Sequence, residues 1–334
     1  MSSNVDACRY PTSKLPQVSV IVPVYNGERD LPELLPRLLQ QTYPPDRVEY
    51  LLVDNASRDR TADLIQTAAA QAQAQNGHLR LLQETEIQSS YAARNRGIRA
   101  ARGEILAFTD ADCCPQPEWL INLVQPFQNP QMGLAVGEVE AFPGRTWLEQ
   151  YAERKQLLSQ RHTLAHAFCP YGQTANLAVR AKAFAQAGLF RPYLTTGGDA
   201  DLCWRVQHQS WQLQFVESAI VQHRHRTSLT ELYRQWHRYG RSNQFLHQLH
   251  GVELARSLSR QEIRHQLLRW LVKELPQAAF RQLTGSGSAV ELVMAPLGLY
   301  CAYAHSVGQR QAQLPAAARE IVWLSPVSTC EDLT

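Results

Sequence analysis

Residues 105–112 read Ile-Leu-Ala-Phe-Thr-Asp-Ala-Asp, and this stretch decides the fold. It is an apolar run that ends in two aspartates, Asp110 and Asp112, with one residue between them. A short apolar run entered from Arg102-Gly103 predicts a buried strand. In an open parallel sheet, the ligand crevice lies at the carboxyl ends of the strands. Both aspartates are therefore expected at the edge where a ligand binds.

Two carboxylates at such an edge need a cation. Like charges this close repel, burial disfavours both of them, and no lysine stands near them in the sequence. Mg²⁺ and Mn²⁺ prefer oxygen ligands and are often held by one or two carboxylates together with phosphate oxygens. Asp110 and Asp112 therefore predict a divalent metal, Mn²⁺ or Mg²⁺, that carries a diphosphate. The alternative is a solvated turn at the end of the strand, because Asp-x-Asp is a common pattern.

Two earlier predicted strands are also followed by polar residues, which are expected at the same edge of the sheet. Val18-Ser19-Val20-Ile21-Val22 is followed by Pro23-Val24-Tyr25-Asn26-Gly27, which contains strong turn residues. Tyr50-Leu51-Leu52-Val53 is followed by Asp54-Asn55-Ala56-Ser57, and leucines at helical spacing from Leu31 to Leu39 lie between the two strands. Strands that alternate with helices predict βαβ units and a parallel sheet.

Four motifs now occur in an order that resembles the family 2 glycosyltransferases with the GT-A fold. They are Pro23-Val24-Tyr25-Asn26, Val53-Asp54-Asn55-Ala56-Ser57, Asp110-Ala111-Asp112 and Gly198-Asp199-Ala200-Asp201-Leu202-Cys203-Trp204-Arg205. The resemblance covers the chain from Val18 to Gly240. It implies an α/β chain with a mostly parallel central sheet, helices on both faces of it, and a C-terminal helical extension.

The resemblance also implies a role for each motif. The Asp after the second strand binds the nucleotide base in the family, and this role falls on Asp54. The Asp-x-Asp holds the metal and the donor diphosphate, which falls on Asp110, Ala111 and Asp112. The catalytic base maps to Asp199. The other expected donor-binding residues are Pro23, Tyr25, Asn26, Asn55 and Arg94.

The chain departs from the family at the catalytic base. The family has a Glu-Asp pair, whereas Asp199 follows Gly198, so no neighbouring carboxylate tunes the pKa of the base. We expect Asp199 just before a helix, where it faces the cleft together with Gly198. Asp201 is a second candidate for the cleft, although it can instead pair with Arg205 four residues later along the helix.

A further strand and a histidine pair complete the candidate site. Ala175-Asn176-Leu177-Ala178-Val179 reads as a strand whose equivalent in the family lines the active site, so Asn176 is a candidate for substrate contact, with a turn or capping role as the alternative. His223 and His225 follow the apolar pair Ile220-Val221 and would share a face if the strand continued. By the resemblance, His223 reaches the metal or the diphosphate, with His225 second. The alternative is that both lie in a basic surface loop.

Composition and length set the domain organisation. A chain of 334 residues with 44% hydrophobic content can bury one large core and still carry an extension. We expect a tail over 1–17, a glycosyltransferase domain over 18–240 whose nucleotide-binding half ends near 140, and a helical extension over 241–334. Of the seven cysteines, two are adjacent at 113–114, five are scattered and none belongs to a Cys-x-x-Cys, which favours reduced thiols. The N-terminus has no apolar run, so a cytoplasmic protein without a signal peptide is expected.

The extension carries an apolar stripe of Leu267, Leu268, Leu271, Val272 and Leu275. The basic residues that flank this stripe are Arg264, Arg269 and Lys273. The later apolar segment 292–303 is interrupted by Pro296 and is shorter than the roughly 20 residues of a membrane span. These features predict helices that lie on an anionic membrane, at the inner face of the plasma membrane, or that pack under the catalytic domain.

The prediction is a metal-dependent inverting glycosyltransferase of the hexosyltransferase type. Its donor would be a nucleotide-diphosphate sugar and its acceptor a glycan, a lipid-linked molecule or a small molecule, with no nucleic acid partner. Gln235-Trp236-His237-Arg238-Tyr239 matches the Gln-x-x-Arg-Trp signature of processive synthases only loosely, so single-sugar transfer is favoured. The alternatives are a sugar nucleotidyltransferase, which normally has a Gly-rich loop with Arg after the first strand, and a non-catalytic scaffold that binds sugar nucleotides or lipids.

Overall fold

The computed structural model describes residues 15–144 and 146–324, so most of the predicted tail over 1–17 lies outside the described residues. The chain forms two compact units. Of the described residues, the first unit comprises 15–138, 160–221 and 320–324, and the second comprises 139–144, 146–159 and 222–319. Each unit is therefore built from segments that are far apart in the sequence.

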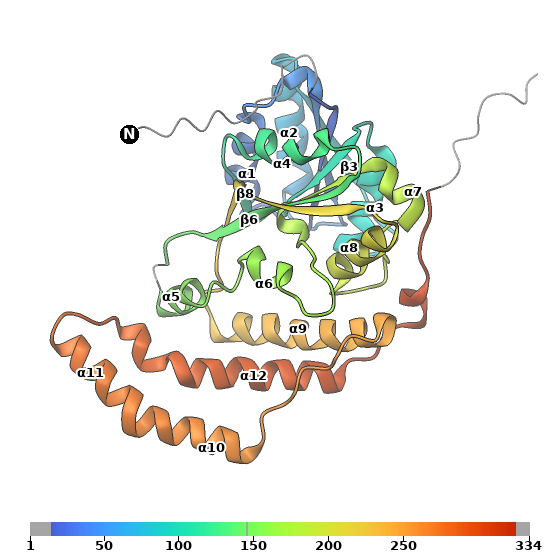
Figure 1. The fold of residues 1–334 in the computed structure, drawn as a ribbon. Helices are drawn as coiled ribbons and strands as arrows, with labels where there is room; N and C mark the ends of the chain where they lie inside the picture. The colour runs from blue at the N-terminus through green and yellow to red at the C-terminus, as the bar shows by residue number, and fades with distance from the viewer. Residues whose placement is uncertain (1–14, 145, 325–334) are drawn as a thin grey trace, which may run out of the picture. The chain divides into compact units, whose positions relative to one another are not determined.

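An eight-stranded sheet, with the order β3-β2-β1-β4-β7-β6-β8-β5, organises the chain (Figure 1). The strands are β1 (Val18–Val24), β2 (Val48–Asp54), β3 (His78–Gln83), β4 (Ile105–Phe108), β5 (Cys113–Pro115), β6 (Met132–Ala141), β7 (Leu177–Arg180) and β8 (Gln212–His223). β1 pairs in parallel with β2 and β4, and β2 pairs in parallel with β3, whereas β7 is antiparallel to both β4 and β6. The predicted parallel sheet is confirmed for the strands that carry the donor motifs.

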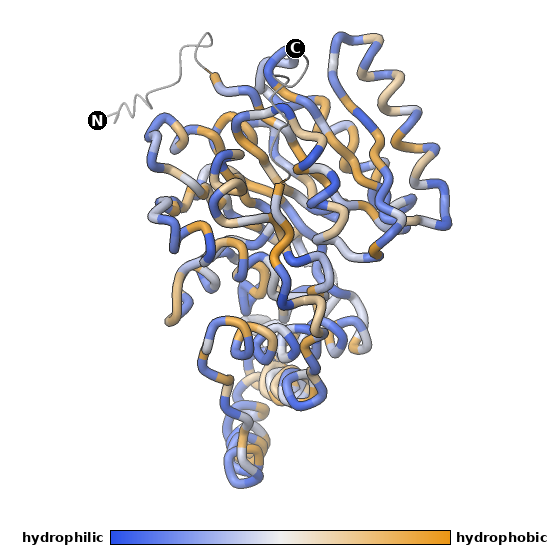
Figure 2. Tube along the Cα trace, turned by 90° about the vertical axis from the view of Figure 1, so that its right-hand side faces the viewer, coloured by the Kyte–Doolittle hydropathy of each residue, from blue (hydrophilic) through white to orange (hydrophobic). Residues whose placement is uncertain are grey.

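Burial explains why these segments form central strands. All four residues of β4 are buried, and β1 and β2 each have a single residue that is not, so these strands are buried on both faces, as parallel strands covered by helices are. The hydropathy of the chain, drawn along its trace in Figure 2, shows long hydrophobic stretches in the sheet-containing unit. The helices of the first unit are α1 (Leu31–Leu39), α2 (Thr61–Ala74), α3 (Ser90–Ala100), α4 (Trp119–Leu123), α6 (Gln160–Leu164), α7 (Ala181–Ala187) and α8 (Gly198–His208).

The second unit is helical. Its helices are α5 (Trp147–Arg154), α9 (Leu229–His250), α10 (Arg260–Arg269), a π-helical stretch (Trp270–Glu274), α11 (Leu275–Leu283) and α12 (Met294–Gln311). α9 and α12 lie side by side (Figure 1), and glycines allow their backbones to approach closely. A Cβ on Gly240 would lie 1.9 Å from the carbonyl oxygen of His305, and a Cβ on Gly308 would lie 1.9 Å from that of His237.

This division differs from the predicted boundary at 240. α9 belongs to the second unit because Leu232 shares a buried cluster with Leu297 and Cys301 of α12 and with Leu148 and Tyr151 of α5. The predicted domain over 18–240 would include the first half of α9, whereas in the structure the buried face of this helix packs within the helical unit.

The apolar C-terminal segment is longer than the sequence predicted. Pro296 lies in the first turn of α12, where its missing N–H breaks no helical hydrogen bond, so the helix continues to Gln311. Among the described residues, one helix, Ala289–Gln311, is long and apolar enough to cross a membrane by length and composition, with a mean hydropathy of 1.2.

Candidate active site

The turn after β1 is tied to the turn after β2. Asn26 adopts a left-handed backbone with φ 49°, and its side-chain oxygen accepts the N–H of Arg58 at 2.9 Å. The N–H of Asn26 donates to Ser57 Oγ at 2.8 Å. Tyr25, by contrast, is half exposed, and Pro23 is partly exposed. Asn26 therefore shapes the edge, while Tyr25 presents an aromatic ring to solvent there.

Asp54 is the last residue of β2 and Asn55 follows it, both in buried positions. The Oδ1 of Asp54 accepts the N–H of Ser57 at 3.0 Å. The side-chain amide of Asn55 donates to the carbonyls of Glu84 and Ile87, each at 3.0 Å. The amide nitrogen of Asn55 thus fixes the loop after β3 against the end of β2.

The Asp-x-Asp turn has a cationic partner that the sequence reasoning did not assign to it. Arg94 on α3 is 4% exposed, and its Nη2 donates to the Oδ1 of Asp110 at 2.5 Å. Burial alone would lower the pKa of Arg94, but the charges of Asp110 and Asp199 outweigh burial and raise it. The sequence showed no lysine near the Asp-x-Asp pair, and in the structure the cationic partner of Asp110 is an arginine, Arg94.

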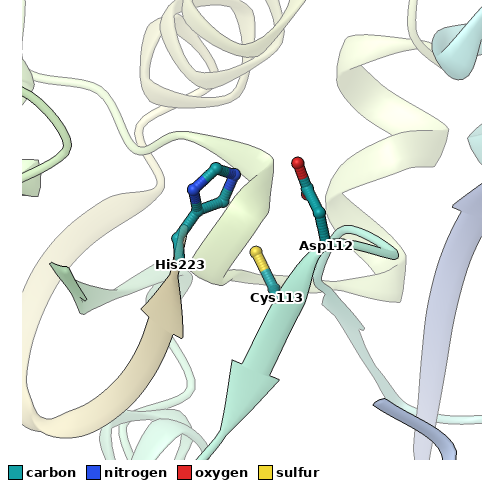
Figure 3. Close-up of side chains that lie close together, drawn as sticks. All are labelled: Asp112, Cys113 and His223. Carbon is teal, nitrogen blue, oxygen red and sulfur yellow. The ribbon is translucent and has the colours of Figure 1, made fainter. Parts of the chain in front are cut away.

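Asp112 lies in the same turn, next to the buried Cys113 (Figure 3). Burial, with the charges of Asp112 and Asp110, raises the pKa of the Cys113 thiol well above its ordinary value. Cys113 is therefore a neutral thiol, whereas Asp112 offers the carboxylate oxygens that Mg²⁺ and Mn²⁺ prefer. The carboxylate oxygens of this turn would suit a hard divalent cation.

Asp199 lies in the first turn of α8, not before the helix as expected. Gly197 caps this helix in the left-handed conformation, with φ 81°, which brings the partly exposed Asp199 to the second helical position. Its Oδ1 accepts the hydroxyl of Thr174 at 3.1 Å. The pKa of Asp199 is raised above its ordinary value, mainly because the carboxylate is buried. The positive charge of Arg94 lowers this pKa, and the negative charge of Asp110 raises it further.

Asp201 is not a cleft residue. Its side chain has no exposed surface and accepts hydrogen bonds from two arginines, Arg191 Nε at 3.0 Å and Arg205 Nη2 at 2.8 Å. The predicted pair with Arg205 is confirmed, and Arg191 was missed because it lies ten residues away, outside any helical spacing. Asp201 therefore pairs with two arginines inside the core and is a structural residue, not part of the site.

Asn176 is also a structural residue. It is fully buried, and its amide nitrogen donates to the carbonyls of Glu138 and Ala219, each at 2.8 Å. Its amide oxygen accepts the indole N–H of Trp119 at 2.7 Å. Since the side chain is occupied in joining strands, the expected substrate contact is not supported. Residues 174–176 form a 3₁₀ turn, and the strand begins at Leu177.

The histidine pair lies at the end of β8. His223 is the last residue of the strand (Figure 3), and His225 follows it, so the two do not share a strand face as expected. Both are buried. Burial, followed by the charge of His223, lowers the pKa of His225 to about 4, so this imidazole is neutral at ordinary pH.

Comparison with known proteins decides the family. The description "Glycosyl transferase family 2" matches residues 19–186, and "Glycosyl transferase family group 2" matches residues 105–307. The glycosyltransferase AglE of Haloferax volcanii is 35% identical over 252 residues, which cover 73% of this chain and 79% of that protein. The chain belongs to glycosyl transferase family 2. It is therefore a glycosyltransferase that takes the sugar from a nucleotide-sugar donor.

Two further proteins are similar to this glycosyltransferase over part or most of its length. The undecaprenyl-phosphate 4-deoxy-4-formamido-L-arabinose transferase of Shewanella sediminis is 35% identical over 108 residues, which cover 32% of each chain. The structure of a mannosyltransferase, PcManGT from Pyrobaculum calidifontis in complex with GDP-Man and Mn²⁺, aligns with a TM-score of 0.63 at 20% identity and covers 90% of this chain and 88% of that one. The structural likeness confirms the GT-A fold.

The glycosyltransferase contains two contacts that sequence reasoning did not find. Thr174 reaches Asp199 from 25 residues away, and no sequence pattern signals this pairing. Tyr91 accepts the N–H of Gly198 at 2.9 Å. Tyr91 and Arg94 are three residues apart on α3, so helical spacing places them on one face, which was the available signal.

Proposed function

We propose that this glycosyltransferase transfers a single sugar with inversion, with Asp199 as the general base. Asp199 would take the proton of the acceptor hydroxyl while that oxygen bonds to the anomeric carbon and the bond from this carbon to the diphosphate oxygen breaks. The nucleoside diphosphate leaves with the electron pair of the broken bond. The observation that carries this proposal is that α3 contacts both turns: its Tyr91 hydroxyl accepts the N–H of Gly198, next to Asp199, and its Arg94 donates to Asp110 in the Asp-x-Asp turn.

We propose that Asp112, supported by Asp110, holds the divalent metal and that Asp54 contacts the nucleotide base. The metal would neutralise the charge on the leaving diphosphate. His223 is proposed as a further metal ligand, with His225 second. In support, β8 neighbours β5 in the sheet, and the N–H of Gln116 donates to the carbonyl of Ile220, three residues before His223.

The test is hydrolysis of a panel of nucleotide sugars, including GDP-mannose, UDP-glucose and UDP-N-acetylglucosamine, by purified protein with Mn²⁺ or with chelator. We expect release of nucleoside diphosphate from one donor class, in Mn²⁺ only. A sugar nucleotidyltransferase would instead release pyrophosphate from a nucleoside triphosphate and a sugar phosphate, and a scaffold would bind without turnover.

We propose that the acceptor is lipid-linked and that α10 and α11 dock on an anionic membrane. Exposed apolar side chains follow one another through both helices and the stretch between them. They are Ile263, Leu267, Leu268, Leu271, Val272, Phe280 and Leu283. Arg264, Arg269 and Lys273 are exposed among them, which suits an interfacial helix on acidic lipid. The similarity to an undecaprenyl-phosphate transferase supports an acceptor of the same kind.

Liposome flotation tests the docking. The variant Leu268→Asp with Val272→Asp should stay unbound to vesicles that contain phosphatidylglycerol, while the wild type floats with them. Gln266→Asp with Gln277→Asp adds the same charge at exposed polar positions of these helices and should still float. If the wild type fails to float, the membrane proposal is wrong while the proposed transfer reaction is unaffected.

A further inference from the structure

The residue before the catalytic base has no room for a side chain. Gly198 is the first residue of α8, and a Cβ built on it would lie 2.6 Å from the Cζ of Tyr91 and 2.8 and 2.9 Å from the two Cε atoms. Contacts this short with a ring require the ring to move. The glutamate that precedes the catalytic aspartate in family 2 is thus replaced here by a glycine whose empty side is filled by Tyr91.

Tyr91 cannot easily move out of that space. Its ring is buried and stacks on Phe190, with the centroids 5.5 Å apart and the planes inclined by 18°. The guanidinium of Arg94 lies 5.6 Å from the centroid of the same ring. At the backbone, the N–H of Tyr91 donates to Oγ of Ser89, the N-cap of α3. The hydroxyl of Tyr91 is therefore presented from a fixed ring.

This hydroxyl accepts the N–H of Gly198 at 2.9 Å. The first N–H groups of a helix have no partner within the helix, and a buried N–H without a partner is costly. The contact from Tyr91 therefore holds the first turn of α8, in which Asp199 follows directly. On the same face of α3, Arg94 bonds the carboxylate of Asp110. Helix α3 thus contacts both the first turn of α8, which carries Asp199, and the turn that carries Asp110 and Asp112.

We propose that Tyr91 is the positioning residue for the catalytic base, fixing the first turn of α8 so that Asp199 faces the acceptor hydroxyl. The inference rests on the proposed role of Asp199. Tyr91 takes over the place of the family's glutamate by geometry, not by charge. It touches neither substrate nor metal in this role, so its removal should change turnover and leave donor binding intact.

The first test is Tyr91→Phe, which keeps the ring and removes only the acceptor oxygen. We expect kcat for hydrolysis of the best donor to fall by about 10- to 100-fold, and KM for the donor to stay within about twofold of the wild-type value. The expected loss of kcat lies between the effect of losing one hydrogen bond and the effect of misplacing a reacting group. The matched control is Tyr43→Phe. Tyr43 is similarly buried, and its hydroxyl donates to the carbonyl of Pro16 at 2.7 Å, before the amino end of β1 and thus at the opposite end of that strand from Asn26.

A purely structural role predicts that Tyr91→Phe and Tyr43→Phe behave alike, with equal losses of Tm and no loss of kcat in the folded protein. That result would overturn the proposal. Amide hydrogen exchange gives a readout that does not need turnover: exchange at residues 198–201 should speed up about 2- to 10-fold in Tyr91→Phe and not in Tyr43→Phe. Unchanged exchange there would also overturn it.

A compensating pair sharpens the test. Gly198→Glu alone should lose kcat by 100-fold or more, in about the upper range expected for a reacting group displaced by a clash. Adding Tyr91→Ala opens the space for the glutamate side chain, so the double variant should be at least about 10-fold more active than Gly198→Glu, a non-additive effect. Additive losses would count against the proposal. If the wild type turns over no donor, the proposed function fails, and hydrogen exchange still decides whether Tyr91 holds the turn.

Discussion

Loss of the Asp201 carboxylate should destabilise the first unit far more than a surface ion pair does. Asp201 is fully buried and accepts hydrogen bonds from Arg191 and Arg205. The Arg205 guanidinium also donates to the backbone carbonyls of Ala187, Gly188 and Leu189, so it joins the end of α7 to α8. Replacement of the carboxylate leaves two buried cations facing each other.

The magnitude follows from burial. An exposed pair four residues apart on a helix contributes about 0.3–0.5 kcal/mol, whereas removing one partner of a buried pair costs about 3–5 kcal/mol. Asp201→Asn should therefore lower the free energy of unfolding by about 3–5 kcal/mol. For a domain of about 200 residues, this corresponds to a fall in Tm of about 6–20 °C. Fluorescence of Trp204, which is buried on the same helix, reports the transition.

Glu33→Gln is the matched control. Glu33 pairs with Arg37 at 3.9 Å with the same spacing of four residues, but both side chains are about a third exposed. This variant should change the free energy of unfolding by no more than about 0.5 kcal/mol. If Asp201→Asn and Glu33→Gln have equal small effects, the buried carboxylate does not stabilise the unit and the reasoning from burial fails.

Three other variants test the site and the membrane face. Asp112→Asn should abolish the recovery of donor binding by Mn²⁺ after chelation, as measured by calorimetry; equal affinity in both conditions in the wild type would contradict the metal site. Asp199→Asn should lower kcat by about 10²- to 10⁴-fold with donor affinity retained. Because the folded pKa of Asp199 is raised, its ionisation lowers stability as pH rises above its ordinary value of 3.8, so Asp199→Asn should melt above the wild type at pH 7 and lose this advantage near pH 3. Leu268→Asp with Val272→Asp should leave kcat for donor hydrolysis unchanged while abolishing flotation, and a parallel loss of both would mean misfolding.

The sequence was sufficient for the parts of the fold that follow local rules. The apolar runs before Asp54 and Asp110 predicted parallel strands, and the strands end at the predicted edge. The spacing of Asp201 and Arg205 predicted their pairing, because residues four apart on a helix are neighbours. These predictions succeeded because the period of a strand, the period of a helix and the residues of a turn are all set by neighbours within a few positions in the sequence.

The failures share a dependence on long-range packing. Asn176 was expected in the cleft because its strand lines the site, but its amide is used by Trp119 and by two backbone carbonyls distant in the sequence. From the sequence, Gly198 marked only the loss of the family's glutamate. In the structure, the space for a side chain on Gly198 is filled by the ring of Tyr91, which lies 107 residues earlier in the sequence. The boundary at 240 failed for the same reason, because α9 packs on α12, which begins at Met294.

The last segment of the first unit has a consequence for synthesis of the chain. Val322 accepts the N–H of Leu189, and a Cβ on Gly188 would lie 2.3 Å from Ile321, so residues after the helical unit return to the sheet unit. A nascent chain that has reached Val221 must wait for about 100 more residues, or about 5–20 s at ordinary ribosome speeds, before this segment emerges. During that time the loop at 187–189 has no closing segment. A chain truncated at 259 would stay in that incomplete state, and chaperone dependence should therefore peak while the helical unit is being made.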